Sequence, residues 1–311
     1  MEFVHKSVLF DECMSALNIT PGGIYVDGTL GGGGHSYGIC ERLSGSGRLI
    51  GIDRDPEALK AASARLEPFS DITTFVHSNY SEIESVLSDL GIDGIDGALL
   101  DLGVSSYQID NPERGFSYIK DAPLDMRMNP EDPISAYDVV NKYDKADLIR
   151  ILKDYGEERM AGKIASIIIR KREIKPIETT LELADIVKSA MPPAIRNGGS
   201  NPCKRTFQAL RIEVNRELEL LKGALTAFFN SLKPGGVLAV ITFHSLEDRI
   251  VKNLFAELTA GCICSKDLPV CVCGNKPKGK LVLRKPAVAS EAELQENIRS
   301  HSAKLRAIEK F

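Results

Sequence analysis

The segment YVDGTLGGGGHS, residues 25–36, decides the fold of this chain. It joins a short apolar run that ends in Asp27 to a glycine-dense turn, and the turn leads into a stretch with helical periodicity. Glycines permit positive φ angles and let a ligand approach the main chain, and the first N–H groups of a helix have no partner within it. The segment therefore predicts a strand, a ligand-binding turn and a helix.

Apolar runs alternate with amphipathic stretches through the first hundred residues. Each run is bounded by Gly, Asp or Ser, as buried parallel strands tend to be. One amphipathic stretch opens with Asp55 as a helix N-cap and Pro56 at the first helical position. The alternation predicts right-handed βαβ units and a doubly wound α/β sheet. The predicted strands are 24–27, 48–53, 72–77 and 97–101, and the predicted helices are 36–43, 56–66 and 81–90.

The alternation stops after the fourth strand. Segment 109–203 shows no convincing strand pattern, but it carries helical patterns separated by Pro- and Gly-rich turns. One long helix is predicted from 204 to 232, followed by a buried strand at 237–243. We therefore predict an all-helical domain, 109–203, inserted into a discontinuous sheet domain formed by 1–108 and 204–311. The helices of the insert are predicted at 134–142, 145–155, 157–171 and 181–191.

The composition is that of an ordinary globular chain, with 43% hydrophobic and 26% charged residues and a formal net charge of −4. The longest apolar runs are far shorter than the ~20 residues that span a bilayer, and the first residues lack the pattern of a signal peptide. Isolated cysteines suit a reducing compartment, so we expect a cytoplasmic protein with no membrane segment. Basic runs at 170–172 and 276–285 leave RNA binding open, although a solvated surface is the simpler explanation.

Acidic and aromatic residues follow the other predicted strands. Asp53 ends the second strand, where doubly wound proteins place an acid that binds the ribose hydroxyls of a nucleotide, and Asp55 already fills the alternative role of helix cap. Tyr80 follows the third strand, where its ring suits an adenine or the core. Asp101 ends the fourth strand and faces the ligand crevice. The turn departs from G-x-G-x-x-G at Ser36, and both NAD and S-adenosylmethionine fit the pattern.

Over nearly its whole length the chain resembles the bacterial 16S rRNA (cytosine-N4) methyltransferases. The matching stretches are 27–36, 101–108, 114–117, 123–128, 155–159, 205–212 and 243–249. The resemblance implies a class I (Rossmann-like) methyltransferase sheet with an inserted helical domain. The basic run at 170–172 and the position of the insert after Asp101 in the chain suggest that this domain recognises RNA. The resemblance also implies S-adenosylmethionine as cofactor and, as substrate, the N4 amino group of a cytidine in the decoding region of 16S rRNA, within the small ribosomal subunit. Carried over residue by residue, the cofactor contacts are Gly33, Gly34, His35, Asp53, Tyr80, Asp101 and Gln108.

Asp101 is the candidate catalytic residue. N4 of cytosine is a poor nucleophile because its lone pair is delocalised into the ring, and a carboxylate that accepts from the amino hydrogens stabilises the charge that develops there. The alternative is that Asp101 contacts the cofactor alone. His244 could accept a proton, but the pattern from Ser245 to Asp248 favours a helix start capped by Ser245.

Four clustered cysteines, Cys262, Cys264, Cys271 and Cys273, form a separate pattern. Four thiolates can hold zinc in a tetrahedron. The C-x-C spacing is tighter than the usual one, so reduced free thiols are an equal alternative.

Other functions fit parts of the pattern. They are a DNA or small-molecule methyltransferase on the same fold, an NAD-dependent oxidoreductase, and a non-catalytic RNA-binding factor of ribosome assembly. The intact glycine turn and Asp101 argue against the non-catalytic factor. Stabilisation by one cofactor and not the other would separate the oxidoreductase from the methyltransferase.

Overall fold

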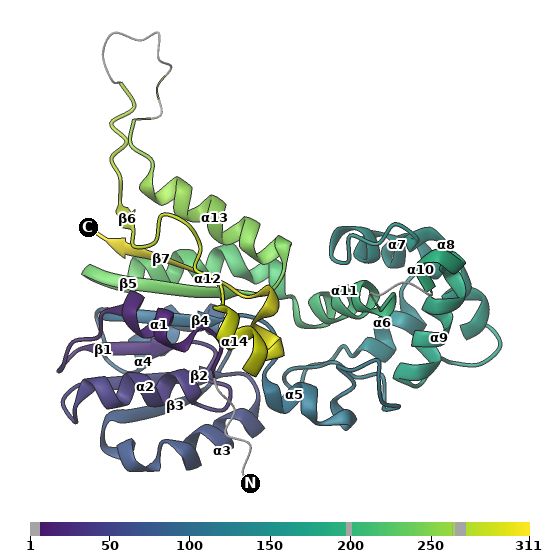
Figure 1. Ribbon diagram of the computed structural model, residues 1–311, viewed down its shortest axis with the longest axis horizontal. Helices are drawn as coiled ribbons and strands as arrows, with labels where there is room; N and C mark the ends of the chain where they lie inside the picture. The colour runs from purple at the N-terminus through teal and green to yellow at the C-terminus, as the bar shows by residue number, and fades with distance from the viewer. Residues whose placement is uncertain (1–6, 197–200, 263, 265–271) are drawn as a thin grey trace. The chain divides into compact units, whose positions relative to one another are not determined.

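The computed structural model describes residues 7–196, 201–262, 264 and 272–311 (Figure 1). The chain divides into two compact units. One, called the sheet unit here, consists of Met1–Gly103 and Leu218–Phe311, and the other, the helical unit, consists of Val104–Glu217. No helix among the described residues is long and apolar enough to cross a membrane.

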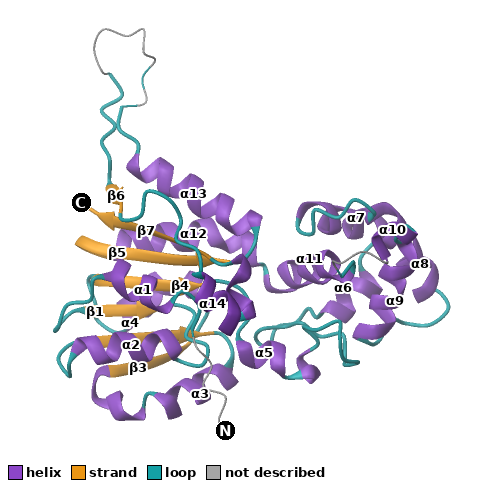
Figure 2. Ribbon diagram, viewed as in Figure 1, coloured by secondary structure: helices purple, strands orange, loops and turns teal. Residues whose placement is uncertain are grey.

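The described residues of the sheet unit form one seven-stranded sheet with the order β3-β2-β1-β4-β5-β7-β6 (Figure 2). β1 to β5 pair in parallel, whereas β7 is antiparallel to both β5 and β6. This order, with an antiparallel last strand between the fifth and sixth, confirms the predicted class I methyltransferase sheet. The strands are β1 Ile24–Asp27, β2 Arg48–Asp53, β3 Thr73–His77, β4 Ile95–Asp101, β5 Leu232–Thr242, β6 Gly279–Leu281 and β7 Lys304–Lys310.

Both faces of the sheet are buried, and successive side chains of one strand enter different cores. On β4, Leu99 packs in one apolar cluster, while Ala98 and Leu100 pack in the other. Burial on both faces explains why the strands read as continuous apolar runs. The helices of this unit are α1 Phe10–Leu17, α2 Gly34–Leu43, α3 Pro56–Arg65, α4 Ile83–Asp89, α12 Glu217–Ser231, α13 Ser245–Thr259 and α14 Glu291–Glu296, with short 3₁₀ helices η1 Glu67–Ile72, η2 Tyr80–Glu82 and η4 Ile298–Ser302.

The helical unit has an apolar core of its own, formed by residues from 124 to 214. Its helices begin where polar side chains can cap them: Ser135 and Thr179 each take part in a capping box, and Asp144 accepts from the Asp147 N–H. The elements are α5 Ser106–Asp110, η3 Pro112–Arg114, α6 Ala136–Lys142, α7 Lys145–Asp154, α8 Ala161–Arg172, α9 Thr180–Ala190, α10 Pro193–Arg196 and α11 Cys203–Asn215.

The single helix predicted from 204 to 232 is wrong. α11 ends at Asn215, Arg216 takes a left-handed conformation with φ 52°, and α12 begins at Glu217. Phe207 and Leu210 of α11 are buried in the core of the helical unit, so this helix belongs there. The units therefore meet in sequence after Gly103 and after Glu217, instead of at the predicted 108/109 and 203/204 boundaries.

Two further differences concern strands. β5 begins at Leu232, five residues before the predicted start, and its pairing with β4 shifts register between Ile95 and Gly97. β7 was not predicted from the sequence, because charged residues at Lys304, Arg306 and Lys310 interrupt its apolar pattern.

Asn215 connects α11 to the loop that precedes α6. Its Oδ1 accepts from the Met128 N–H at 2.8 Å, and its Nδ2 donates to the Met126 carbonyl at 2.8 Å. The side chain is buried, so removing it leaves these backbone groups without their partner.

We expect Asn215→Ala to lower the free energy of unfolding by about 2–4 kcal/mol, since each orphaned buried polar group costs about 1–3 kcal/mol. The exposed Asn230 of α12 supplies the control, because Asn230→Ala should change the free energy by less than about 0.5 kcal/mol. Denaturant unfolding measures both. Equal stability of the two variants would contradict this account of Asn215.

Candidate active site

Three carboxylates stand at one edge of the sheet. β1, β2 and β4 end at Asp27, Asp53 and Asp101, and the three strands are adjacent and parallel. Their carboxyl ends therefore lie side by side, which is where ligands bind in doubly wound sheets. We call these three residues the acid edge.

Asp27 holds the glycine turn together. Its Oδ1 accepts from the Thr29 N–H at 3.2 Å, and its Oδ2 accepts from the Ser36 hydroxyl at 2.7 Å. The Thr29 hydroxyl accepts in turn from the Asp101 N–H at 2.6 Å. From the sequence, Asp27 is predicted only as the last residue of its strand. The signal was present in the sequence, because Thr29 and Ser36 are hydroxyl residues at the two ends of the glycine turn.

The predicted glycines have steric reasons to be glycine. Gly33 has φ 71° and is the N-cap of α2, a conformation that side chains rarely adopt. A Cβ at Gly34 would overlap the hydroxyl of Ser7. Because Gly33 and Gly34 have no side chains, the start of α2 can lie close to its neighbours. A ligand can also approach the backbone of the turn closely.

Asp53 fixes the other side of the turn. Its Oδ2 accepts from the Gly31 N–H at 2.8 Å, and its Oδ1 accepts from the Asp55 N–H at 2.9 Å. The Arg54 backbone also donates to this carboxylate, which can accept about four hydrogen bonds in all and so can still receive a ribose hydroxyl. Asp55 caps α3 through the Glu57 N–H, as predicted.

Tyr80 begins η2, directly beyond β3. Its Cβ would be 3.4 Å from a side chain placed at Gly28, so it lies beside the start of the glycine turn. The ring is partly buried against the apolar cluster of α4 and α12. Core packing is therefore part of its role, and contact with an adenine remains a prediction.

His35 and Asp101 face each other across the acid edge. His35 Nε2 lies 2.9 Å from the Val8 carbonyl, which can only accept, so this nitrogen carries the proton. Burial lowers the pKa of His35 to about 4, and the ring is neutral at pH 7. Its Nδ1 is then an acceptor, 3.8 Å from Asp101 Oδ2. This contact is not an ion pair, because the imidazole is neutral.

Asp101 carries the most perturbed carboxyl of the edge. Burial raises its pKa to about 8, and repulsion from Asp27 and then Glu247 adds to the shift. Although 27% of the side chain is exposed, Oδ1 is buried without a hydrogen-bond partner among the described residues. The pKa values of Asp27, to about 6, and of Asp53 are also raised, chiefly by burial.

The electrostatics of the acid edge distinguish between the two cofactors. Desolvated carboxylates are relieved by a cation and repel an anion. S-adenosylmethionine carries a sulfonium and an α-ammonium group, whereas the pyrophosphate of NAD is negative. The residues therefore fit S-adenosylmethionine, while contacts of its ribose with Asp53 and of a positive group with Asp101 stay predictions.

Gln108 belongs to the helical unit. It is buried, and its Oε1 accepts from the Ser105 N–H at 2.9 Å as half of a capping box that starts α5. The described contact is thus a structural one, and a contact with the cofactor stays a prediction.

The start of α13 is capped, but the capping residue predicted is wrong. His244 is the N-cap, and its Nδ1 accepts from the Glu247 N–H at 3.4 Å, whereas Ser245 is the first residue of the helix. Glu247 Oε2 accepts in return from the Phe243 N–H at 2.8 Å. His244 Nε2 lies 3.0 Å from Glu247 Oε1, too poorly aligned for a hydrogen bond. The described hydrogen bond of the His244 ring is thus the one that caps the helix, and a role as proton acceptor stays untested.

Comparison with known proteins identifies the family. The model of the MraW methylase family matches residues 2–311. The chain belongs to this family. "Ribosomal RNA small subunit methyltransferase H 2" of Agathobacter rectalis is 55% identical over 311 residues, which cover 100% of this chain and 99% of that protein. "Ribosomal RNA small subunit methyltransferase H" of Heliobacterium modesticaldum is 54% identical over 312 residues, all of both chains.

A solved structure of an rRNA methylase from Streptococcus thermophilus has a TM-score of 0.42 and 11% identity, with 97% of this chain and 93% of that one covered. Likeness at this level adds nothing to the family membership. As a member of the MraW methylase family, the protein is a methyltransferase and its cofactor is S-adenosylmethionine. The oxidoreductase and non-catalytic alternatives are thereby set aside.

We expect cofactor binding at pH 7 to release up to about one proton. In the folded protein without cofactor, the raised pKa keeps Asp101 protonated between about pH 4 and about pH 8, and this contribution to stability is lost as the pH rises through about 8. A cation bound nearby favours the carboxylate, so affinity should increase with pH across that window.

Titration calorimetry in buffers of different ionisation enthalpy measures the released proton. Asp101→Asn should remove most of the release. An unchanged release in that variant would show that the proton comes from another group.

Proposed function

We propose that this methyltransferase transfers the methyl group of S-adenosylmethionine to N4 of a cytidine in the decoding region of 16S rRNA, within the small ribosomal subunit. The 54–55% identity of the whole chain to proteins named ribosomal RNA small subunit methyltransferase H supports the substrate class. The proposal includes the cytoplasm as the place of action, because ribosomal subunits are found there. The observation that carries the chemistry is the buried Oδ1 of Asp101, which lacks a partner among the described residues.

The reaction does not need a strong base. It needs a group that accepts a hydrogen bond from the amino nitrogen. The cofactor, when bound, supplies an electrophilic methyl group on a positively charged sulfur. The Asp101 carboxylate, whose side chain is 27% exposed, accepts a hydrogen bond from the N4 amino group. This bond directs the nitrogen lone pair away from the ring and stabilises positive charge on nitrogen. The same carboxylate can receive the proton that the methylated nitrogen then loses.

Asp101 acts only as the carboxylate in this scheme. Its pKa of about 8 means that it is mostly protonated at neutral pH before the cofactor binds. The positive charge of the cofactor lowers that pKa and generates the acceptor. Binding of the methyl donor thus prepares the group that receives the nucleophile's hydrogen.

The helical unit is the candidate RNA-binding part. α8 ends in three basic residues, of which Arg170 and Lys171 are exposed, while Arg172 donates to the Val140 carbonyl at 2.7 Å. Exposed cations at one helix end suit phosphate contacts, which fix the position of an RNA without reading its bases. The target base would be splayed from its stack to reach the cofactor.

Methyl transfer from labelled S-adenosylmethionine tests the proposal. Small ribosomal subunits, protein-free 16S rRNA and duplex DNA serve as parallel substrates, and the labelled nucleoside is identified by chromatography. We expect N4-methylcytidine from the small subunits. Label in another nucleoside, or in DNA alone, would contradict the proposal.

We expect Asp101→Asn to slow a single turnover by about 10²–10³, the usual cost of losing one partner of the transition state. Asn keeps one carbonyl acceptor but not the charge. Asp96→Asn is a matched control on the same strand, because Asp96 accepts from the Ile24 N–H at 2.8 Å and pairs with Lys233, outside the acid edge. Weakened cofactor binding with a normal single-turnover rate would make Asp101 a cofactor contact alone.

The double variant Arg170→Ala with Lys171→Ala should weaken binding to rRNA and reduce its salt dependence, by about one unit of slope for each phosphate that the variant no longer binds. Lys145→Ala, which removes an exposed lysine at the start of α7, is the control within the same unit. Filter binding over a series of salt concentrations measures both. An unchanged slope in the double variant would remove the end of α8 from the RNA-binding surface.

A further inference from the structure

The segment between α13 and β6 carries the clustered cysteines. Its two ends are held together, because the Lys278 N–H donates to the Leu258 carbonyl at 2.8 Å. Asn275 Nδ2 donates to the carbonyls of Ala260, at 3.1 Å, and Gly261, at 2.7 Å. These bonds bring together residues that are 14 to 20 positions apart in sequence.

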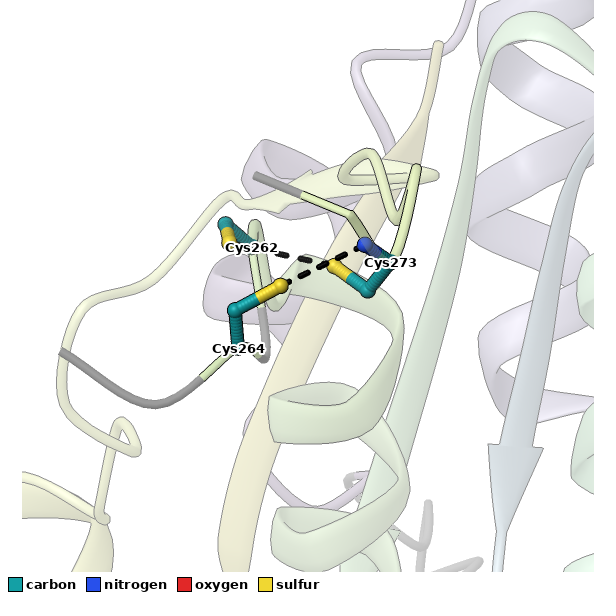
Figure 3. A group of neighbouring side chains, drawn as sticks. All are labelled: Cys262, Cys264 and Cys273. Carbon is teal, nitrogen blue, oxygen red and sulfur yellow. Dashed lines mark hydrogen bonds between the residues drawn. The ribbon is translucent and has the colours of Figure 1, made fainter. Parts of the chain in front are cut away.

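Three thiols of this segment lie close together (Figure 3). They belong to Cys262, Cys264 and Cys273, and we call them the thiol cluster. Their sulfurs all lie within 4.8 Å of one another, and the sulfurs of Cys262 and Cys273 are 3.8 Å apart. A disulfide would need about 2.05 Å. Thiolates at ~2.3 Å from a zinc ion, placed at the corners of a tetrahedron, are ~3.8 Å apart. The distance between Cys262 and Cys273 equals this spacing, and the 4.8 Å limit on the other two pairs is compatible with it.

Backbone N–H groups point at the sulfurs. Cys264 Sγ accepts from the Val272 N–H at 3.4 Å and from the Cys273 N–H at 3.3 Å. Cys273 Sγ accepts from the Asn275 N–H at 3.4 Å. Such bonds favour the thiolate form of a cysteine. In metal sites, hydrogen bonds to the ligands hold those ligands in the right orientation, and these N–H groups can orient the sulfur atoms in the same way.

The other described cysteines differ in every respect. Cys13, Cys40 and Cys203 are buried and isolated, and burial raises the pKa of Cys40 to about 12 and that of Cys203 to about 11. They are packed as small apolar side chains. Cys262 and Cys273 are exposed, so packing does not explain the thiol cluster.

We propose that Cys262, Cys264 and Cys273 bind a structural Zn²⁺ ion that fixes the segment between α13 and β6. Three soft thiolates select zinc over the hard cations Mg²⁺ and Ca²⁺, which prefer oxygen ligands. Cys271, the fourth cysteine of the sequence pattern, lies outside the described residues, and the proposal rests on the other three. It is independent of the methyl-transfer chemistry.

The metal content of the full-length protein tests this proposal. After purification in reducing buffer, addition of Zn²⁺ and desalting, we expect about one zinc per chain by elemental analysis. Replacement by Co²⁺ should give the thiolate-to-cobalt charge-transfer band and the intense visible bands of tetrahedral cobalt. Cys264→Ser should lose both signals, whereas Cys203→Ala, which removes a buried thiol of the helical unit, should keep them.

A second measurement covers the case in which Cys264→Ser does not fold. In the wild-type protein, zinc should protect the cluster thiols from alkylation, and a chelator should expose them and speed amide exchange at Val272, Cys273 and Asn275. Peptide mapping reads both effects. Absence of zinc after loading, equal alkylation with and without chelator, or a Cys262–Cys273 disulfide in freshly prepared protein would overturn the proposal.

Discussion

Burial of three neighbouring carboxyl groups is the constraint on which the site depends, and repulsion between them adds to its effect. Asp27 and Asp53 are stabilised by bonds from the turn that they hold, whereas Asp101 has an oxygen with no such partner among the described residues. The sheet therefore gathers acidic groups at a place where the protein itself offers little to stabilise their ionised forms. A site of this kind is less stable when it is empty and gains stability when a cation binds. A methyl donor with a positively charged sulfur therefore suits it better than a ligand with a negatively charged pyrophosphate does.

The two units reach stability by separate means. The sheet unit buries both faces of its sheet, and the helical unit has its own core and its own connecting residue, Asn215. Arg216, in a left-handed conformation, separates the helix that belongs to one core from the helix that belongs to the other. Substitutions in one core should therefore leave the contacts of the other intact.

Much of this architecture is readable from the sequence, because strands buried on both faces and helices with Ser, Thr or Asp caps have strong local signals. The glycine turn and the acid edge follow from the same patterns. The break at Arg216 has no such signal, since neither Gly nor Pro marks it, and the left-handed residue is fixed by the two cores. His244 is an uncommon N-cap, so the pattern favoured its neighbour Ser245. The bonds of Asp27 and the distance between His35 and Asp101 are tertiary, and spacing alone could not supply them.

Insertion of the helical unit between β4 and β5 has a consequence for synthesis on the ribosome. β4 needs β5 as its second neighbour in the sheet, yet the whole of Val104–Glu217 is translated between them. Residues 102–231 lie between the two strands, so at about 5–20 residues per second β5 follows β4 by roughly 7–26 s. The nascent chain must carry a strand with one unpaired side and apolar side chains on both faces throughout that interval, while the insert can already collapse on its own core. Folding of the nascent sheet should therefore depend more on chaperones, and on the pace of translation through the insert, than folding of the insert itself.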